Sequence, residues 1–229
     1  CYKEALGYLT NLINDVSAPT NILARAYFAL GDVLMNGTEL QPAERWTRAI
    51  SAYATVRQQF PESELRWLAV GRIGQCYLQL AAQPDSDPVN LAKAQESFQQ
   101  VAESNADTAM RSNAKLGLAE THRAMARTAK TDEAVAHHET ALKHALDVFY
   151  ADSGFYGSGE KPKGFWLYQA GLTAAKIRID TGRADLAARL YESMEKMFPS
   201  QQEALRAMRG QLSRRPDPSP LSTSNGFPQ

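Results

Sequence analysis

Four stretches of the chain repeat one two-part pattern, and this repetition restricts the fold more than any other feature of the sequence. In the first part, apolar residues recur at positions i, i+3, i+4 and i+7 around one small residue. The second part has the same periodicity and carries an alanine that is followed, four residues later, by an aromatic residue or a histidine. This periodicity is typical of amphipathic helices, whereas no convincing alternation of period two, which marks strands, is found. The sequence therefore predicts an all-α fold built from helix pairs.

Three kinds of position align the four repeats. The small residue of the first helix is Gly31, Gly74, Ala119 and Ala175 in turn. The alanine of the second helix is Ala49, Ala94, Ala134 and Ala187. The aromatic position is held by Tyr53, Phe98, His138 and Tyr191. A proline closes the first and the last repeat, at Pro61 and Pro199.

This set of positions resembles the motif of the tetratricopeptide repeat family, over roughly residues 2–212. The resemblance implies a right-handed superhelical solenoid of antiparallel helix pairs, with about four and a half repeats. The half repeat is the first segment, 2–15, which is similar to a second helix without its first, so we expect part of the natural chain to lie upstream. Insertions between the two helices of the first three repeats predict either longer helices or looser turns there. Residues 213–229 are rich in proline and serine and predict a flexible tail.

Two glycines, Gly71 and Gly74, interrupt the otherwise apolar helical segment 60–81. A glycine inside a helix costs roughly 1 kcal/mol relative to alanine. We expect Gly74 to be kept because the two helices of a pair approach closely there, where a larger side chain would hold them apart. Glycine at this position is therefore interpreted as a packing requirement.

Charge and hydropathy limit the partners of the chain. Its 25 Lys and Arg residues balance its 25 Asp and Glu residues, so no overall field favours nucleic acid or an acidic membrane surface. No apolar run approaches the roughly eighteen residues that a membrane span needs. We therefore expect neither nucleic acid as a partner nor a membrane span.

The two cysteines have different expected roles. Cys76 lies among apolar residues of a predicted helix and is expected to be a buried small hydrophobe. Cys1 allows two interpretations, a lipidated first residue of the kind found in bacterial lipoproteins or an end created by cleavage. The second is favoured because a helical pattern follows at once, without a polar tether.

Motifs for catalysis or metal binding fail on inspection. Gly154 and Gly159 have the spacing of a phosphate-binding loop, but Glu160 stands where the lysine belongs. His138 and Glu139 begin a zinc-protease motif, whose second histidine is replaced by Leu142. We expect His138 to fill the aromatic core position and the other histidines, His122, His137 and His144, to be solvated. The sequence predicts no enzyme, no cofactor and no metal.

An aromatic loop precedes the fourth repeat, and its key residues are Phe155, Tyr156, Phe165 and Trp166. Long aromatic loops can bind partners. The alternative, which is favoured, is that these rings pack over the seam between the third and fourth repeats.

The family resemblance also implies a concave groove, lined by the first helix of each pair. Residues that flank the small position are carried over as its lining: Arg25, Asp32, Asn36, Gln75, Gln79, Asn113, Glu120, Arg123, Gln169 and Lys176. This polar set with several amides suits hydrogen bonding to a peptide or protein partner. We therefore expect a non-catalytic interaction scaffold.

Two other roles stay open, a docking or sensor module of a larger protein and a structural subunit that self-associates through its first helix. A weaker likeness to bacterial envelope repeat proteins, such as outer-membrane assembly lipoproteins, is carried by segment 60–81. That likeness implies a periplasmic or outer-membrane-associated location, with the cytoplasm as the alternative.

Overall fold

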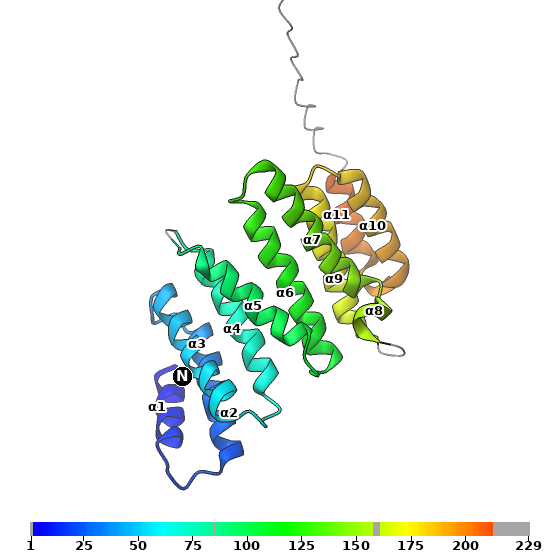
Figure 1. Cartoon of the computed structure of the whole chain (residues 1–229). Coiled ribbons are helices and arrows are strands. Elements are labelled where there is room, and N and C mark those ends of the chain that lie inside the picture. Colours follow the sequence, from blue (N-terminus) through cyan, green and yellow to red (C-terminus); the bar gives the residue numbers. More distant parts are fainter. Residues whose placement is uncertain (1, 85, 158–160, 213–229) are drawn as a thin grey trace, which may run out of the picture. The chain divides into compact units, whose positions relative to one another are not determined.

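The computed structural model describes residues 2–84, 86–157 and 161–212, and within them the secondary structure is entirely helical (Figure 1). Cys1, Gly159, Glu160 and the predicted tail lie outside these residues. The helices are α1 (Tyr2–Ile13), α2 (Thr20–Asn36), α3 (Pro42–Gln59), α4 (Arg66–Ala81), α5 (Val89–Ala102), α6 (Thr108–Ala126), α7 (Thr131–Phe149), α8 (Ser153–Tyr156), α9 (Gly164–Asp180), α10 (Ala184–Met197), the 3-10 turn η1 (Pro199–Gln201) and α11 (Gln202–Leu212). The predicted all-α class is confirmed for this part of the chain.

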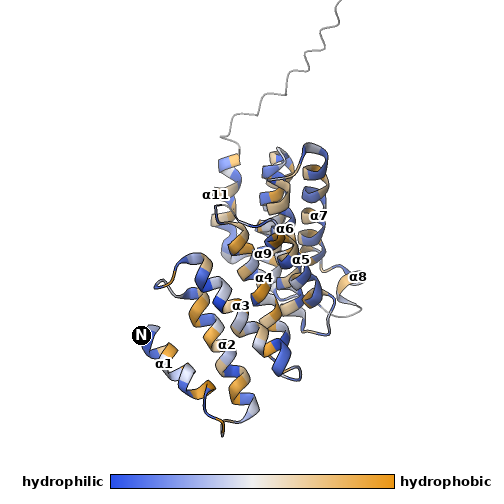
Figure 2. Cartoon of the chain, turned by 60° about the vertical axis from the view of Figure 1, so that its left-hand side comes forward, coloured by the Kyte–Doolittle hydropathy of each residue, from blue (hydrophilic) through white to orange (hydrophobic). Residues whose placement is uncertain are grey.

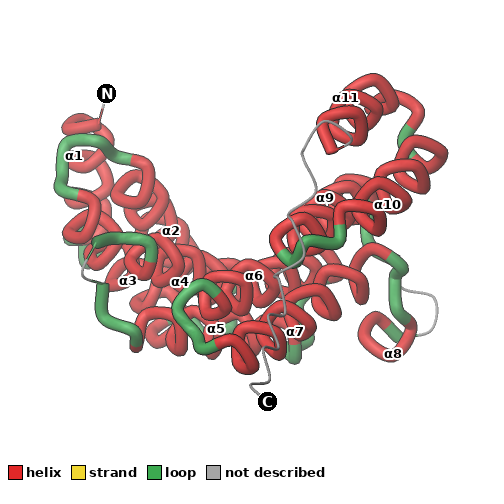
Figure 3. Tube along the Cα trace, turned by 90° about the horizontal axis from the view of Figure 1, so that it is seen from above, coloured by secondary structure: helices red, strands yellow, loops and turns green. Residues whose placement is uncertain are grey.

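The chain divides into two compact units, Cys1–Thr173 and Ala174–Gln229, and the division falls inside α9. In the first unit, α1 to α7 pack in the order of the sequence, each helix against the next (Figure 3). Contacts between neighbours are the rule in stacked helical repeats. This consecutive packing is compatible with the predicted solenoid of helix pairs.

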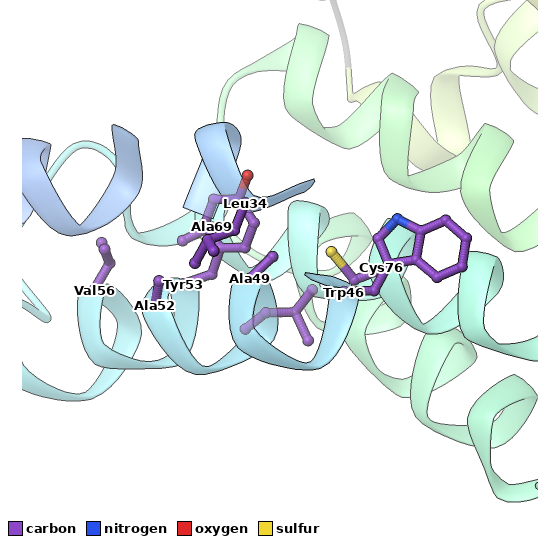
Figure 4. Close-up of a cluster of buried hydrophobic side chains, with 9 residues drawn as sticks. Leu34, Trp46, Ala49, Ala52, Tyr53, Val56, Ala69 and Cys76 are labelled. Carbon is purple, nitrogen blue, oxygen red and sulfur yellow. The ribbon is translucent and has the colours of Figure 1, made fainter. Parts of the chain in front are cut away.

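These helices are amphipathic, and Figure 2 shows hydrophobic and hydrophilic residues alternating along them. In the first unit, one cluster of buried side chains gathers around α3 (Figure 4). It contains Leu34, Trp46, Ala49, Ala52, Tyr53, Val56, Ala69, Ile73 and Cys76. Cys76 is fully buried, as predicted, and burial raises the pKa of its thiol to about 12. It is therefore a neutral core residue near pH 7.

In the pairs α2–α3 and α4–α5, a glycine of the first helix lies against an aromatic ring of the second helix. A Cβ added at Gly31 would lie 2.5 Å from the ring of Tyr53, and one at Gly74 would lie 2.9 Å from the ring of Phe98. The expected close approach at Gly74 is thus an approach of a ring to the helix backbone. Gly71 has open space at the same point, so packing does not require glycine there.

The second unit consists of the end of α9, α10, η1 and α11. Glu195 of α10 is only 6% exposed, and its two carboxylate oxygens face Arg206 Nε at 3.3 Å and Arg209 Nε at 3.2 Å on α11. Leu205 is fully buried in the same helix. Helix α11 is therefore held to α10 by one buried leucine and one shared carboxylate.

Among the described helices, none combines the length and the apolar character that a bilayer crossing requires.

Candidate functional site

A pocket of about 780 Å³ lies in the first unit between α4, α6 and the first half of α9. Its lining residues come from these three helices and from Phe98 and Asp107: Leu68, Arg72, Gln75, Leu78, Phe98, Asp107, Ala109, Met110, Asn113, Leu116, Gly117, Glu120, Phe165, Trp166, Gln169 and Thr173. Four of the ten predicted groove residues are among them, namely Gln75, Asn113, Glu120 and Gln169. The structure thus brings these four predicted residues into one hollow, although Gln75 and Gln169 are 94 positions apart in the sequence.

Helix α6 sets the length of the pocket. Its lining residues include Met110, Asn113, Gly117 and Glu120, which follow the three- and four-residue steps of one helix face, and the N-cap residue Asp107 begins this row. From Asp107 to Glu120 the helix rises about 20 Å, at 1.5 Å per residue. The wall that α6 contributes is therefore about 20 Å long, with a carboxylate at each of its ends.

A side-chain cap explains where α6 begins. The carboxylate of Asp107 accepts a hydrogen bond from the backbone N–H of Met110 at 2.8 Å. Such a contact satisfies one of the free donors of the first turn. Asp107 therefore both starts α6 and contributes to the pocket wall.

The apolar part of the pocket is built around Phe98. Its ring lies against the backbone of α6, because a Cβ added at Gly117 would be only 2.5 Å from it. The same ring faces Gly74 on α4, and both Phe98 and Gly117 line the pocket. Leu78, Met110 and Leu116 extend this apolar surface.

Arg72 is the cation of the pocket, and sequence analysis did not select it. Its Nε lies 3.4 Å from Oδ1 of Asp32, and its terminal nitrogen donates to Oε1 of Gln75 at 2.9 Å. The hydroxyl of Tyr53 donates to the same Asp32 oxygen at 2.6 Å. Burial and the Asp32 carboxylate raise the pKa of Tyr53, so its hydroxyl stays a donor. Asp32 therefore orients Arg72 rather than lining the pocket itself.

Glu120 and Arg123 form an ion pair on α6, with 2.9 Å between Arg123 Nη1 and Glu120 Oε2. Arg123, predicted to face the groove, is only 5% exposed and does not line the pocket. Arg123 affects the pocket through Glu120, because its guanidinium fixes the position of the Glu120 carboxylate.

The aromatic loop is divided between two roles. Phe155 and Tyr156 belong to α8 and pack against α6, where the Tyr156 hydroxyl lies 2.7 Å from Ser112 Oγ and Arg111 lies over the Phe155 ring at 4.8 Å. Phe165 and Trp166 begin α9, contact each other edge to face at 4.9 Å, and line the pocket. Phe165 is 61% exposed. The first two rings thus pack against α6, and the other two present aromatic surface at the pocket.

The remaining predicted groove residues lie elsewhere. Arg25 pairs with Glu64 at 3.2 Å beside a separate hollow of about 580 Å³, next to the turn between α3 and α4. The side-chain amide of Asn36 donates to the carbonyl of Asp32 at 2.8 Å within α2. Gln79 is exposed on α4. Lys176 is exposed and belongs to the second unit.

Three of the four histidines contact one another between α6 and α7, where solvated side chains were expected. Nδ1 of His122 lies 3.1 Å from Nδ1 of His137, and the ring of His122 stacks on that of His144 at 5.7 Å. His138 is half-buried, which agrees in part with its predicted core position. Within the described residues, no group of three or more His, Cys, Asp or Glu side chains is placed to hold a metal ion.

The two carboxylates of the pocket lining lie far apart. The carboxylates of Asp107 and Glu120 are separated along α6 by about 20 Å, whereas paired catalytic carboxylates lie roughly 5–9.5 Å apart. The other polar lining groups are three side-chain amides, the Thr173 hydroxyl, the Trp166 indole N–H and the paired guanidinium of Arg72. Such groups donate or accept hydrogen bonds.

Comparison with protein-family models and with curated proteins gives no match to this chain.

Proposed function

We propose that this protein is a non-catalytic interaction module of the tetratricopeptide type, which binds a peptide segment of a protein partner in the pocket between α4, α6 and α9. The observation that carries the proposal is the pocket itself, where apolar surface and three side-chain amides converge from three helices. Concave sites with an apolar lining and a few polar groups are the usual form of ligand-binding sites. The right-handed superhelix and the repeat number remain part of this proposal.

The lining specifies an amphipathic ligand. An apolar or aromatic side chain of the ligand would contact Phe98 and Trp166, while the amides of Gln75, Asn113 and Gln169 would pair with its main chain. The lining carries one guanidinium and two carboxylates, which gives a formal charge of 1 − 2 = −1. A cationic side chain near either end of the peptide would complement Asp107 or Glu120.

The length of the pocket fits a short segment. A span of about 20 Å corresponds to about six residues in an extended peptide or about thirteen in a helix. A linear segment of a larger partner therefore satisfies the geometry.

The test compares two variants with matched composition. One carries Gln75→Ala, Asn113→Ala and Gln169→Ala in the pocket, and the other carries Asn11→Ala, Gln58→Ala and Gln201→Ala at exposed positions outside it. Both are checked for helical content by circular dichroism and used beside wild type to capture partners, whose bound segments are then mapped by peptide arrays. The proposal requires that the pocket variant alone loses the partner. Equal capture by both variants, with both folded, would exclude the pocket.

The cell envelope is proposed as the location, on the family likeness alone. Fractionation of the source cells into periplasm, membranes and cytoplasm, with detection by antibody, tests it. Recovery in the cytoplasmic fraction would reject this location and leave the pocket proposal intact.

Self-association through α1 is a second candidate function, and one observation favours it. None of the α1 side chains is fully buried, and Tyr8 is 77% exposed. A second copy packed on this helix would cover that surface. Sedimentation velocity over a wide concentration range tests this, since Tyr8→Glu is expected to abolish any concentration-dependent dimer of wild type.

A further inference from the structure

A column of three imidazole rings runs between α6 and α7. The ring of His122, on α6, lies between two rings of α7, with centroid distances of 5.3 Å to His137 and 5.7 Å to His144. His137 and His144 are seven residues apart, which is two helical turns, so both face α6. Polar rings thus fill part of a helix interface in which Ala119, Ala141 and Ala145 are fully buried.

The hydrogen bonds of the column limit how many protons it can hold. Nδ1 of His122 and Nδ1 of His137 are 3.1 Å apart, and a hydrogen bond between them needs one donor and one acceptor. Nδ1 of His144 lies 3.4 Å from Lys115 Nζ, and an ammonium group only donates. The acceptor nitrogen in each contact belongs to a neutral ring. These two contacts therefore allow at most one imidazolium among the three rings.

The surrounding charges oppose additional protons. Lys115 of α6 points toward His144 and pairs with Asp147 of α7 at 2.9 Å. Asp147 is also approached by Lys143 at 3.6 Å, so its charge is shared by two ammonium groups. On the α8 side, Lys115 lies over the ring of Phe155 at 4.4 Å. Next to His122 on α6, the charges of Glu120 and Arg123 pair with each other at 2.9 Å.

We propose that this histidine column is a proton-sensitive latch, which keeps α6 and α7 together near neutral pH and loosens them in mild acid. A free histidine takes up its second proton near pH 6.5. When a second ring of the column gains its proton, one acceptor is lost, and two cations then face each other beside Lys115. The helices separate to solvate these charges.

The proton affinities agree with this geometry. Burial, followed by Lys115 and His122, lowers the pKa of His144 to about 4, and burial together with His137 lowers the pKa of His122. A lowered pKa in the folded state means that the unfolded or opened state binds more protons below pH 6.5. Acid therefore favours opening.

The test needs no ligand and uses the whole chain in a buffer that contains a chelator. The ring protons of wild type are followed by NMR as a function of pH, and amide hydrogen exchange is measured at about pH 7.5 and about pH 5.0, corrected for intrinsic exchange. The latch predicts that His144 and His122 titrate below pH 6.5 and that opening of α6 and α7 increases about tenfold or more, which corresponds to 1.36 kcal/mol. Helices α2 and α3 contain no histidine and provide the internal control.

A pair of variants shows whether the acid response depends on the histidine column or only on the number of histidines in α6 and α7. His122→Gln removes the central ring, and His138→Gln removes a half-buried histidine of α7 outside the column. The first is expected to reduce the acid response of α6 and α7, and the second to retain it. Equal responses of the two variants would overturn the proposal. If His122→Gln does not fold, wild-type rings that all titrate near pH 6.5 without a change in exchange would overturn it equally.

Discussion

The ring of Phe98 occupies the space into which a side chain on Gly117 would project, since a Cβ there would lie 2.5 Å from the ring. The same ring faces Gly74 across the helix pair, where the corresponding distance is 2.9 Å. Phe98 therefore links α4, α5 and α6 and forms part of the pocket at the same time. Its position depends on two glycines that come from two different helices.

Gly117→Ala is expected to destabilise the protein by about 1–3 kcal/mol, because the displaced ring costs more than the roughly 1 kcal/mol of helix propensity that alanine gains. Gly71→Ala is the matched control, because its Cβ meets open space on α4. It is expected to be neutral or stabilising by up to about 1 kcal/mol. Urea unfolding at pH 7 measures both changes. A stabilised Gly117→Ala variant would contradict the assigned role of the ring.

Tyr53→Phe removes a 2.6 Å hydrogen bond to Asp32 and is expected to cost about 1 kcal/mol of unfolding free energy. The expected cost is below the roughly 1.5–3 kcal/mol of hydrogen bonds to charged groups because the Asp32 side chain is partly exposed. Tyr8→Phe, at an exposed position, is the control and should change stability by less than about 0.5 kcal/mol. A double-mutant cycle with Asp32→Asn should give a coupling energy of at least about 0.5 kcal/mol. Additive effects would show that the contact does not contribute.

Glu195→Gln is expected to loosen α11 from α10, because the buried carboxylate that holds Arg206 and Arg209 loses its charge. Since both arginines are partly exposed, the expected cost is about 1–2 kcal/mol, below the value for a fully buried pair. Amide hydrogen exchange in α11 measures this loosening.

Glu192→Gln provides the control for this change. Its pair with Lys196 is exposed and spans one helical turn, so its loss should cost only a few tenths of a kcal/mol. Equal exchange in α11 for both variants would contradict the role of Glu195.

Stability is expected to fall as the pH decreases from about 6.5 to about 4, the interval between the unfolded and folded pKa values of His144. The unfolded chain binds the proton first, so the folded state keeps its full stability above pH 6.5 and loses it toward pH 4. The shift sets an upper limit of about 3 kcal/mol, and solvent access reduces the expected loss to about 1–2 kcal/mol. Urea titrations at several pH values measure it. His144→Gln should flatten this part of the curve, and an unchanged curve would contradict the assignment.

Local features of the sequence predicted the helices and the buried state of Cys76, because helical periodicity and apolar neighbours act within a few residues. The side of each helix on which a polar residue lies was predicted less accurately. Arg123 follows Glu120 by three residues, a rotation of about 300°, so the two side chains lie about 60° apart around α6. This difference turns Arg123 into the interior, while Glu120 stays at the pocket.

Contacts between distant segments could not be predicted from spacing. Tyr156 and Ser112 are 44 residues apart in the sequence. Their contact holds one end of the aromatic loop against α6, although nothing in the sequence distinguishes Tyr156 from the other aromatic residues of the loop. The carboxylate of Asp152 accepts from the N–H of Phe155 at 3.2 Å and starts the short helix that places Tyr156 there. Arg72 could have been found, because it precedes Gln75 by three residues and shares its helix face.

The carboxylate of Asp32 on α2 accepts a hydrogen bond from Tyr53 of α3 and forms an ion pair with Arg72 of α4. Arrays of stacked helices usually lose their terminal elements one after another, because each element depends only on its neighbours. Through Asp32, α2 contacts both of the helices that follow it, so the opening of α2 removes one polar contact from α3 and one from α4 at the same time. Unfolding that begins at α2 is therefore expected to cost more than the loss of contacts with a single neighbour.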